Sequence, residues 1–212
     1  MSPAVSHWYH VFAVPGWERI VDEHLSALQT SGLATELGVL HLGLVGPEEQ
    51  REKAAARFRA VMPVEIVAEA DEGWEQVTLT ALHHAVTGGL GGVFLYAHTK
   101  GVAYHSEWND AWRRSMTLCL VAEWRKCLVL LEQHAAVGCH WLTPPSAEFE
   151  VRNPFFGGNF WWAFASVIRG LEPPALDSRH DAEAWLGSAG LANVADRTPG
   201  WPSYGTIRGV RR

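Results

Sequence analysis

The sequence predicts an α/β protein built around an open, mainly parallel, twisted sheet with flanking helices. Three observations support this fold class. Apolar, β-rich runs alternate with segments of helical periodicity between residues 8 and 97. The segments between the runs are long enough to cross over as helices, which neighbouring parallel strands require. The 212 residues, 48% of them hydrophobic and 19% charged, suffice for one domain with a substantial core.

Four apolar runs are expected to form the strands of the first half. Pro15-Gly16 and Gly46-Pro47 end the first two runs, because these residues favour turns over a continuing strand. An acidic stretch ends the third run. The expected strands are 8–14, 39–45, 64–68 and 93–97.

The three segments between these strands have the periodicity of helices. In the first, Trp17, Val21, Leu25 and Leu28 fall on one face at helical spacing. The glycine cluster 88–92 precedes a strand instead of opening a helix, so it is predicted to be a plain turn and not a phosphate-binding loop. The expected helices are 17–28, 48–58 and 74–86.

The second half has a less regular pattern. Residues 107–136 are predicted to form one amphipathic helix, whose apolar stripe, including Trp112 and Trp124, is expected to pack in the core. A tail from 193 to 212 is rich in Gly, Pro and Arg and is expected to cover the surface or to be partly ordered. The other expected elements are a strand at 139–142, a short strand or turn at 158–162, a helix at 163–171 and a helix beginning within 181–186.

Composition and charge exclude several classes of protein. The net charge of −6 argues against electrostatic capture of nucleic acid or of an anionic membrane. No apolar run approaches the ~20 residues of a membrane-spanning helix, and no secretory signal pattern opens the chain. Cys119, Cys127 and Cys139 show no paired spacing and are expected to be buried thiols. We therefore expect a soluble, cytoplasmic protein.

Polar side chains follow the fourth predicted strand. His98, Thr99 and Lys100 come directly after its apolar run. Because open α/β sheets bind ligands at the carboxyl ends of their strands, these side chains are expected to face a ligand, and lysine suits phosphate oxygens. Asp71, after the third strand, is expected either to accept hydrogen bonds from a nucleoside or to stay in solvent near a helix start.

A second unusual stretch, FGGNFWW, runs through residues 156–162. Its paired glycines allow a close backbone approach, and its aromatic rings offer flat, partly apolar surface for a sugar. Asn159 is expected either to orient ligand hydroxyls or to complete the turn. Trp161 and Trp162 point to opposite sides of an extended chain, so we expect one in the core and the other beside a ligand.

These features together resemble the small glycosyltransferases of the GT-A class, whose fold is Rossmann-like. The similarity covers residues 7–187 in outline and implies transfer of a sugar from a nucleotide-diphosphate donor to an acceptor hydroxyl. It also implies one domain over 7–190, with a nucleotide-sugar-binding half (7–105) and an acceptor-binding half (106–190), followed by a C-terminal tail (191–212). The stretches that carry it are WYHVFAV at 8–14, HTKG at 98–101, WRR at 112–114, GGNFWW at 157–162 and RHDAEAW at 179–185.

The resemblance also implies roles for individual residues. Glu183, with Asp181 second, corresponds to the base that deprotonates the acceptor hydroxyl if the anomeric configuration inverts. The alternative is that both are ordinary carboxylates in the first turn of a helix. The implied donor-binding residues are Val14, Asp71, His98, Thr99, Lys100, Arg113 and Arg114. The implied acceptor-binding residues are Gly158, Asn159, Trp161 and Trp162.

One departure from the GT-A pattern concerns the metal. These enzymes commonly carry an Asp-x-Asp pair after the fourth strand, where it holds a divalent cation against the diphosphate, but this chain has Ala97-His98-Thr99-Lys100 there. A lysine is a poor neighbour for such a cation and a good direct partner for diphosphate oxygens. We therefore expect no metal ligands, with Lys100 and Arg113 or Arg114 neutralising the leaving group. Binding of Mn²⁺ or Mg²⁺, with His98 as a ligand, is the less favoured alternative.

Two other classes of function fit the same pattern. A non-catalytic carbohydrate- or nucleotide-binding module would use Lys100 and the tryptophans and would not need Glu183. A nucleotide-binding partner subunit would dock another chain through the amphipathic helix. For the enzyme, the acceptor classes include a glycan, a protein, a small metabolite and a modified nucleobase, and both inversion and retention stay open.

Overall fold

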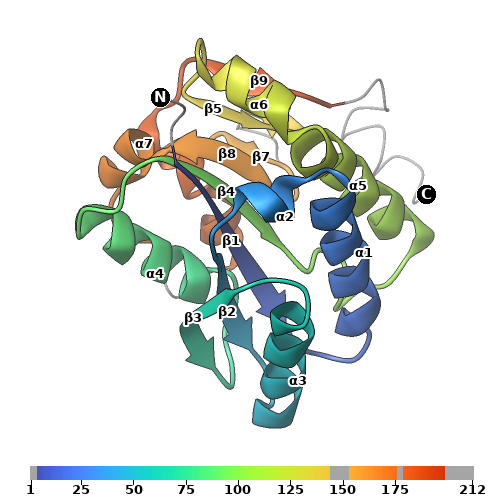
Figure 1. The fold of residues 1–212 in the computed structure, drawn as a ribbon. Coiled ribbons are helices and arrows are strands. Elements are labelled where there is room, and N and C mark those ends of the chain that lie inside the picture. Colours follow the sequence, from blue (N-terminus) through green and yellow to red (C-terminus); the bar gives the residue numbers. More distant parts are fainter. Residues whose placement is uncertain (1–3, 144–152, 176–178, 199–212) are drawn as a thin grey trace, which may run out of the picture.

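A single twisted sheet organises the protein (Figure 1). The computed structural model describes residues 4–143, 153–175 and 179–198. In this part of the chain a seven-stranded sheet has the order β3-β2-β1-β4-β8-β5-β9. Its strands are β1 (Val5–Phe12), β2 (Leu40–Val45), β3 (Val64–Ala70), β4 (Val93–His98), β5 (Ala136–Gly138), β8 (Trp161–Phe164) and β9 (Val194–Asp196). A separate pair joins β6 (Trp141–Leu142) to β7 (Phe155–Phe156).

The sheet is mainly parallel, which confirms the predicted fold class. Strand β1 pairs in parallel with β2 and β4, and β2 pairs in parallel with β3. Strand β8 is antiparallel to both of its neighbours, β4 and β5, and β5 is parallel to β9. Strands β4 and β5 therefore run in the same direction, and their carboxyl ends lie at the same edge of the sheet as those of β1–β3.

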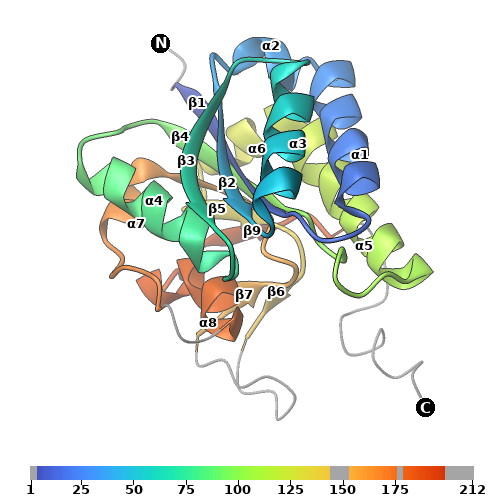
Figure 2. The same cartoon turned by 90° about the horizontal axis from the view of Figure 1, so that it is seen from below.

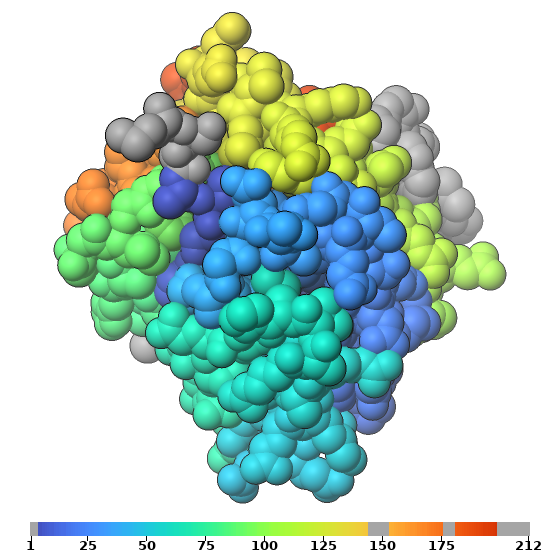
Figure 3. Space-filling model, viewed as in Figure 1, coloured from blue at the N-terminus to red at the C-terminus, as the bar shows by residue number. Residues whose placement is uncertain are grey.

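Helices cover both faces of the sheet (Figure 2). One face carries α1 (Trp17–Thr30), α2 (Leu33–Glu36), α3 (Glu48–Arg59), α5 (Glu107–Thr117) and α6 (Trp124–Leu131). The other carries α4 (Gln76–Thr87), α7 (Ala165–Arg169) and α8 (Arg179–Ala184). Helices α1, α2, α3 and α6 form most of the surface seen in Figure 3. No described helix is both long enough and apolar enough to cross a membrane.

The core of the described chain consists of two large clusters, one on each face of the sheet, and a small third cluster around Phe155 and Ala184. Successive residues of β1 show the division, because alternate side chains of a strand point to opposite faces. Tyr9 belongs to the cluster on the α1 face, which also contains Trp112, whereas Trp8 belongs to the cluster on the α4 face, which also contains Leu79 and Trp161. Cys119, Cys127 and Cys139 are buried free thiols, as expected from the sequence.

The first half of the chain follows the sequence prediction closely. Each expected strand and helix between residues 8 and 97 is present, with ends shifted by at most a few residues. The glycine cluster 88–92 is the predicted turn before β4. Hydrophobic periodicity and turn residues are local signals, and here the tertiary structure agrees with them.

The single long helix predicted at 107–136 is wrong. Helix α5 ends at Thr117, a π-helical segment spans Leu118–Ala122, and α6 follows. Two carbonyls in the π-helical segment accept hydrogen bonds from outside it: Leu120 O from the Trp162 indole at 2.8 Å, and Cys119 O from the Arg197 guanidinium. Such external donors replace part of the regular helical bonding, and they come from segments distant in the sequence.

The second-half strands also differ from the prediction. Of the segment expected as a strand at 139–142, only Trp141 and Leu142 are in a strand, β6, and residues 139–140 form a bend after β5. The helix expected from residue 163 begins at Ala165, because Ala163 pairs with strands on both sides of β8. The predicted surface tail contributes β9, which extends the sheet beside β5. Residues 199–212 of that tail lie outside the described chain.

Candidate functional site

The candidate site lies at the carboxyl edge of the sheet, where β1 and β4 are neighbours. The crossovers from β1 and from β4 lead to opposite sides of this pair, so it is the switch point at which doubly wound sheets bind ligands. Val14 follows β1 and Lys100 follows β4. His140, after β5, and Asn159, before β8, lie at the same edge. The sequence predictions at 98–100 and 158–159 are therefore brought to one edge of the sheet.

Thr99 extends the pairing of β1 with β4 beyond the last strand residues. Its backbone N–H donates to His10 O at 3.0 Å, and its hydroxyl accepts from the Phe12 N–H at 2.9 Å. Thr99 is 2% exposed. The hydroxyl is therefore used inside the protein, where it fixes the direction in which the chain leaves the sheet towards Lys100.

Lys100 and Glu183 form the charged centre of the site. The Lys100 Nζ lies 3.7 Å from the Glu183 Oε1, and the two side chains are 11% and 16% exposed. The same ammonium lies 4.4 Å from the ring centroid of Trp112, a distance suited to a cation–π contact. The site therefore joins the end of β4, helix α5 and helix α8 through three side chains.

Gly158 lies in the segment 156–162, here called the glycine-aromatic turn, and packs this turn against α5. Its φ is 91°, in the region that favours glycine. A Cβ added there would lie 2.8 Å from the Met116 Cε and 3.3 Å from the Trp112 Cε2. The turn thus packs directly on the indole that lies under the Lys100 ammonium. The Gly158 carbonyl also accepts a hydrogen bond from the His98 Nε2 at 2.9 Å.

Glu75, His98 and Asn159 form a buried polar network next to this turn. The His98 Nε2 carries a proton, since its partner is a carbonyl oxygen. The His98 Nδ1 lies 3.2 Å from the Glu75 Oε1, and this contact requires one further shared proton. Glu75 and His98 therefore lie within reach of a shared proton at the end of β4. Glu75, His98 and Asn159 are 6%, 6% and 1% exposed.

Asn159 connects this network to α8. Its φ is 55°, uncommon for a residue other than glycine. The side-chain amide donates to the Glu75 Oε2 at 2.5 Å and to the Ala182 carbonyl at 3.3 Å. Its Oδ1 accepts from the Trp161 indole N–H at 2.8 Å, which fixes the orientation of the amide. Asn159 thus anchors the residue immediately before Glu183.

His140 is a further polar residue at this edge. Its φ is 58°, and its backbone is held on both sides: the N–H donates to the Asp196 Oδ1, and the carbonyl accepts from the Gly157 N–H. The imidazole packs edge-to-face on Trp112, with ring centroids 5.7 Å apart. Burial lowers the pKa of His140, although the charge of Asp196 opposes this. Its Nε2 has no hydrogen-bond partner among the described residues.

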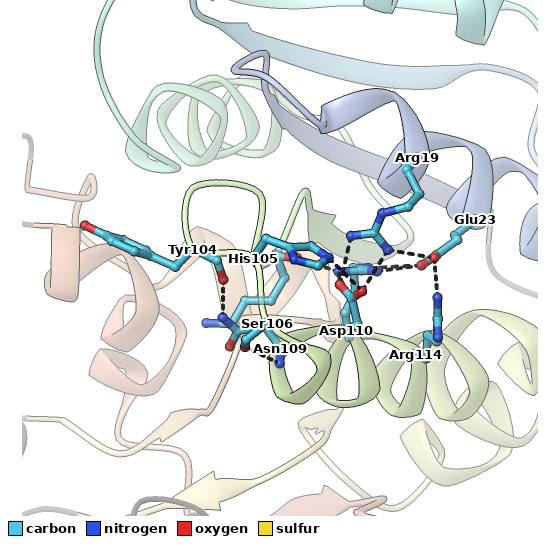
Figure 4. Close-up of polar contacts among 10 residues, drawn as sticks. Arg19, Glu23, Tyr104, His105, Ser106, Asn109, Asp110 and Arg114 are labelled. Carbon is cyan, nitrogen blue, oxygen red and sulfur yellow. Dashed lines mark hydrogen bonds and ion pairs between the residues drawn. The ribbon is translucent and has the colours of Figure 1, made fainter. Parts of the chain in front are cut away.

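The guanidinium groups of Arg113 and Arg114 bind carboxylates of the protein itself, and Figure 4 shows Arg114 beside Glu23. Arg113 donates to Glu23 and Asp110 and is 2% exposed. Arg114 pairs with Glu23 at 2.8 Å, and its side chain is 62% exposed. Arg113 is therefore occupied inside the protein, whereas Arg114 lies at the surface.

The remaining predicted residues lie apart from the Lys100–Glu183 pair or have other contacts. Asp71 is exposed after β3 and pairs with Arg51 at 2.5 Å. Asp181 is exposed at the start of α8. Val14 is half-buried directly after β1.

Trp161 and Trp162 differ from the expectation that one of them lies beside a ligand. They are 1% and 0% exposed and pack in the clusters on opposite faces of the sheet. Both are buried because β8 is covered by helices on each face. Among the described residues, the exposed aromatic side chains at this edge are Trp74, after β3, and Tyr104, whose ring points away from the charged cluster in Figure 4.

Sequence reasoning did not assign Glu75, Trp112 or His140 to the site. Glu75 lies between β3 and α4, and its place a few residues after the third strand is the sequence feature that could have identified it. Trp112 was expected in the core, and it is buried, but one part of its ring also contacts the Lys100 ammonium. His140 was placed within a strand, and its positive φ becomes evident only in the folded chain.

Among solved structures, the chain is similar to S. aureus TarS 1-349, with a TM-score of 0.51 and 11% sequence identity. The similarity covers 96% of this chain, which spans 59% of that structure. It is also similar to 4-diphosphocytidyl-2C-methyl-D-erythritol synthase from Anaerococcus prevotii, with a TM-score of 0.50 and 8% identity over 99% of this chain and 100% of the other. At these identities the similarities establish a shared fold alone.

No curated protein sequence matches the chain. A family match, in contrast, extends from the middle of β1 to the middle of β9 and so includes every residue of the site described above. Over residues 9–195, this chain belongs to the family described as Domain of unknown function (DUF8361).

Proposed function

We propose that this protein is a glycosyltransferase that moves a sugar from a nucleotide-diphosphate donor to an acceptor hydroxyl. The observation that carries the proposal is the Lys100–Glu183 pair, a cation and a carboxylate 3.7 Å apart at the ligand-binding edge of the sheet. Such a pair can neutralise a leaving diphosphate and accept a proton from a nucleophile. The fold shared with the synthase of a diphosphocytidyl compound supports a nucleoside diphosphate as the ligand class.

In the proposed reaction, Glu183 accepts the proton of the acceptor hydroxyl as the hydroxyl oxygen bonds to the anomeric carbon. The bond between that carbon and the diphosphate oxygen breaks, and its electron pair leaves with the nucleoside diphosphate. Lys100 stabilises the negative charge that develops on this leaving group. A single displacement of this kind inverts the anomeric configuration.

The residues at this edge do not fit a divalent metal ion. Glu75 is already shared between His98 and Asn159, and Glu183 faces the Lys100 ammonium, which would repel a cation. Within the described ranges, no three His, Cys, Asp or Glu residues gather into a group that could hold a metal ion. We therefore propose that Lys100, and not a metal ion, contacts the diphosphate.

The two halves of the chain divide the substrates in this proposal. The donor binds over residues 7–105, where Val14 and Thr99 flank the switch point of the sheet. The acceptor binds over 106–190, next to the Gly158 turn and Glu183. The free thiols of the described cysteines support the proposed cytoplasmic location, because a reducing compartment preserves them.

Donor hydrolysis tests the proposal directly. The protein is incubated with UDP-, GDP-, ADP-, CDP- and dTDP-linked sugars, and the release of nucleoside diphosphate is measured. We expect slow hydrolysis of at least one donor by the wild-type protein and none by Glu183→Gln. Binding of a donor without hydrolysis would favour the non-catalytic module. If the protein neither binds nor hydrolyses any of these donors, both the glycosyltransferase and the binding module are ruled out.

A further inference from the structure

We propose that Arg113 is a positioning residue that holds the backbone of Lys100 so that its ammonium faces the ligand. The proposal rests on the proposed function for the identity of that ligand, a nucleoside diphosphate. It gives Arg113 an indirect role, in place of the direct contact with diphosphate that the sequence suggested.

The guanidinium of Arg113 is almost fully engaged. Its Nη1 donates to the Lys100 carbonyl at 3.1 Å and to the Asp110 Oδ1 at 2.9 Å. Its Nε and Nη2 donate to the Glu23 Oε2 at 3.3 and 2.6 Å. The side chain is 3% exposed. These contacts use four of the five N–H donors of an arginine, so a phosphate that binds through two N–H groups would have to displace one of them.

Both carboxylates that hold Arg113 are themselves held by other arginines (Figure 4). Arg19 contacts Glu23 at 3.1 Å and Asp110 at 2.9 Å, and Arg114 contacts Glu23. Burial alone would raise the pKa of Asp110, but hydrogen bonds from Arg19 and Arg113 lower it to about 2. The pKa of Glu23 is likewise below its usual range, because bonds from Arg114 and Arg113 outweigh burial. The Glu23 and Asp110 carboxylates that hold Arg113 therefore stay ionised at neutral pH.

The loop between Lys100 and α5 is tied to α5 at both ends. At its start, the Arg113 bond to Lys100 O is joined by a close approach at Gly101, where an added Cβ would lie 3.0 Å from the Asn109 Cβ. At its end, the Ser106 hydroxyl caps α5 by accepting from the Asn109 N–H, and the Asn109 amide donates to the Tyr104 carbonyl.

Helix α5 also carries Trp112, the indole beneath the Lys100 ammonium. One helix therefore holds Lys100 at two points, its carbonyl through Arg113 and its ammonium through Trp112. Loss of the carbonyl contact should release the backbone while the ammonium keeps only a weak contact with the ring. The ammonium would then occupy its place beside Glu183 for a smaller fraction of the time.

The test compares Arg113→Gln with Arg19→Gln. Arg19 makes the closest match, because it contacts the same two carboxylates but not Lys100. A second variant, Arg113→Lys, keeps the buried positive charge and is therefore expected to unfold less readily than Arg113→Gln. Its ammonium cannot donate to the Lys100 carbonyl and both carboxylates at once, as the planar guanidinium does. Thermal unfolding of each variant confirms that the protein is folded.

The first measurement does not depend on the function. Lys100 is pulse-labelled with an amine-reactive reagent in the full-length protein, and the labelling rate is followed by mass spectrometry. We expect labelling about tenfold faster in Arg113→Gln and Arg113→Lys, a change that corresponds to loss of one hydrogen bond between a charged and a neutral group, and little change in Arg19→Gln. Equal rates in all four proteins would overturn the proposal.

The second measurement is a double-mutant cycle between Arg113 and Lys100. Dissociation constants for UDP, GDP, ADP, CDP and dTDP are measured for wild type, Arg113→Gln, Lys100→Gln and the double variant. If Arg113 acts through Lys100, each single change weakens binding about tenfold and the double change adds little to Lys100→Gln. Additive losses would show that Arg113 contacts the ligand independently. If the wild-type protein binds none of these diphosphates, the proposed function fails, and the labelling rates still decide the positioning role.

Discussion

The side-chain amide of Asn159 donates a hydrogen bond to the carbonyl of Ala182, 3.3 Å away. Ala182 immediately precedes Glu183, so a buried asparagine in the glycine-aromatic turn fixes the backbone beside the proposed base. The same amide contacts Glu75, which pairs with His98 at the end of β4. The Asn159 side chain therefore links helix α8, through Ala182, to the end of β4, through Glu75 and His98.

Replacement of Asn159 by alanine is expected to destabilise the protein by about 3 kcal/mol. The change leaves the buried Trp161 indole N–H and the Ala182 carbonyl without this partner and removes one donor from Glu75. Urea denaturation measures the loss. Asn193→Ala is the matched control, because its amide makes a single exposed bond to the Gln133 carbonyl. Similar losses at the two positions would contradict the importance of the buried network.

Replacement of Gly158 by alanine is expected to cost about 2 kcal/mol, from backbone strain and from displacement of the Met116 side chain. An added Cβ would lie 2.8 Å from the Met116 Cε, at a φ of 91°. Gly89→Ala separates the two causes, since Gly89 has a φ of 113° but no atom within 4 Å of the added Cβ. The midpoint of thermal unfolding should decrease more for Gly158→Ala than for Gly89→Ala. Equal decreases for the two variants would show that the contact of Gly158 with α5 does not contribute to stability.

Acid is expected to destabilise the protein through its buried histidines. Burial lowers the pKa of His7 to about 4 and that of His10 to about 3, whereas in the unfolded chain both titrate near ~6.5. Between these values the unfolded chain binds more protons, so stability is full above the unfolded pKa and is lost as pH falls. Each histidine contributes a slope of about 1.4 kcal/mol per pH unit in that interval.

Urea denaturation between pH 7 and 4.5 measures this slope. His10→Gln should flatten it, because glutamine retains a polar group near the Thr78 hydroxyl but does not titrate. The exposed residue His84 provides the control, and His84→Gln should leave the slope unchanged. A stability that does not depend on pH over this range would show that these imidazoles already carry a proton in the folded protein.

Glu183→Gln is expected to lower kcat for sugar transfer or donor hydrolysis by roughly 10²–10⁴, the range for loss of a general base. Nucleoside diphosphate binding should change little, because Lys100 remains. The same change at Asp181 separates the two candidate bases, since Asp181 is exposed whereas Glu183 faces Lys100. A large loss in Asp181→Asn with activity retained in Glu183→Gln would reverse the assignment.

Removal of divalent metal is expected to leave donor hydrolysis unchanged. In the proposed function the Lys100 ammonium, which lies beside Glu183, contacts the diphosphate in place of a metal ion. Rates are measured with EDTA and then with added MnCl₂. Activity that disappears with the chelator and returns with manganese would contradict direct binding by Lys100 and would direct attention to His98.

The sequence by itself determined the strands and helices of the first half and the position of Lys100 at a strand end. Apolar periodicity and turn residues are properties of neighbouring residues, and in β1–β4 the tertiary structure preserves them. The same information placed Gly158 and Asn159 in a short strand or turn and the cysteines in the core, because glycine pairs and apolar neighbours are also local signals.

Only the tertiary structure decided which of these residues meet. The antiparallel insertion of β8 between β4 and β5 places Asn159 beside Glu75 and buries Trp161 and Trp162. Donors from Trp162 and Arg197 interrupt the helix after Thr117, and the carboxylates of Glu23 and Asp110 engage Arg113. Each outcome depends on contacts between segments far apart in the chain, and residue patterns within one segment carry no information about such partners.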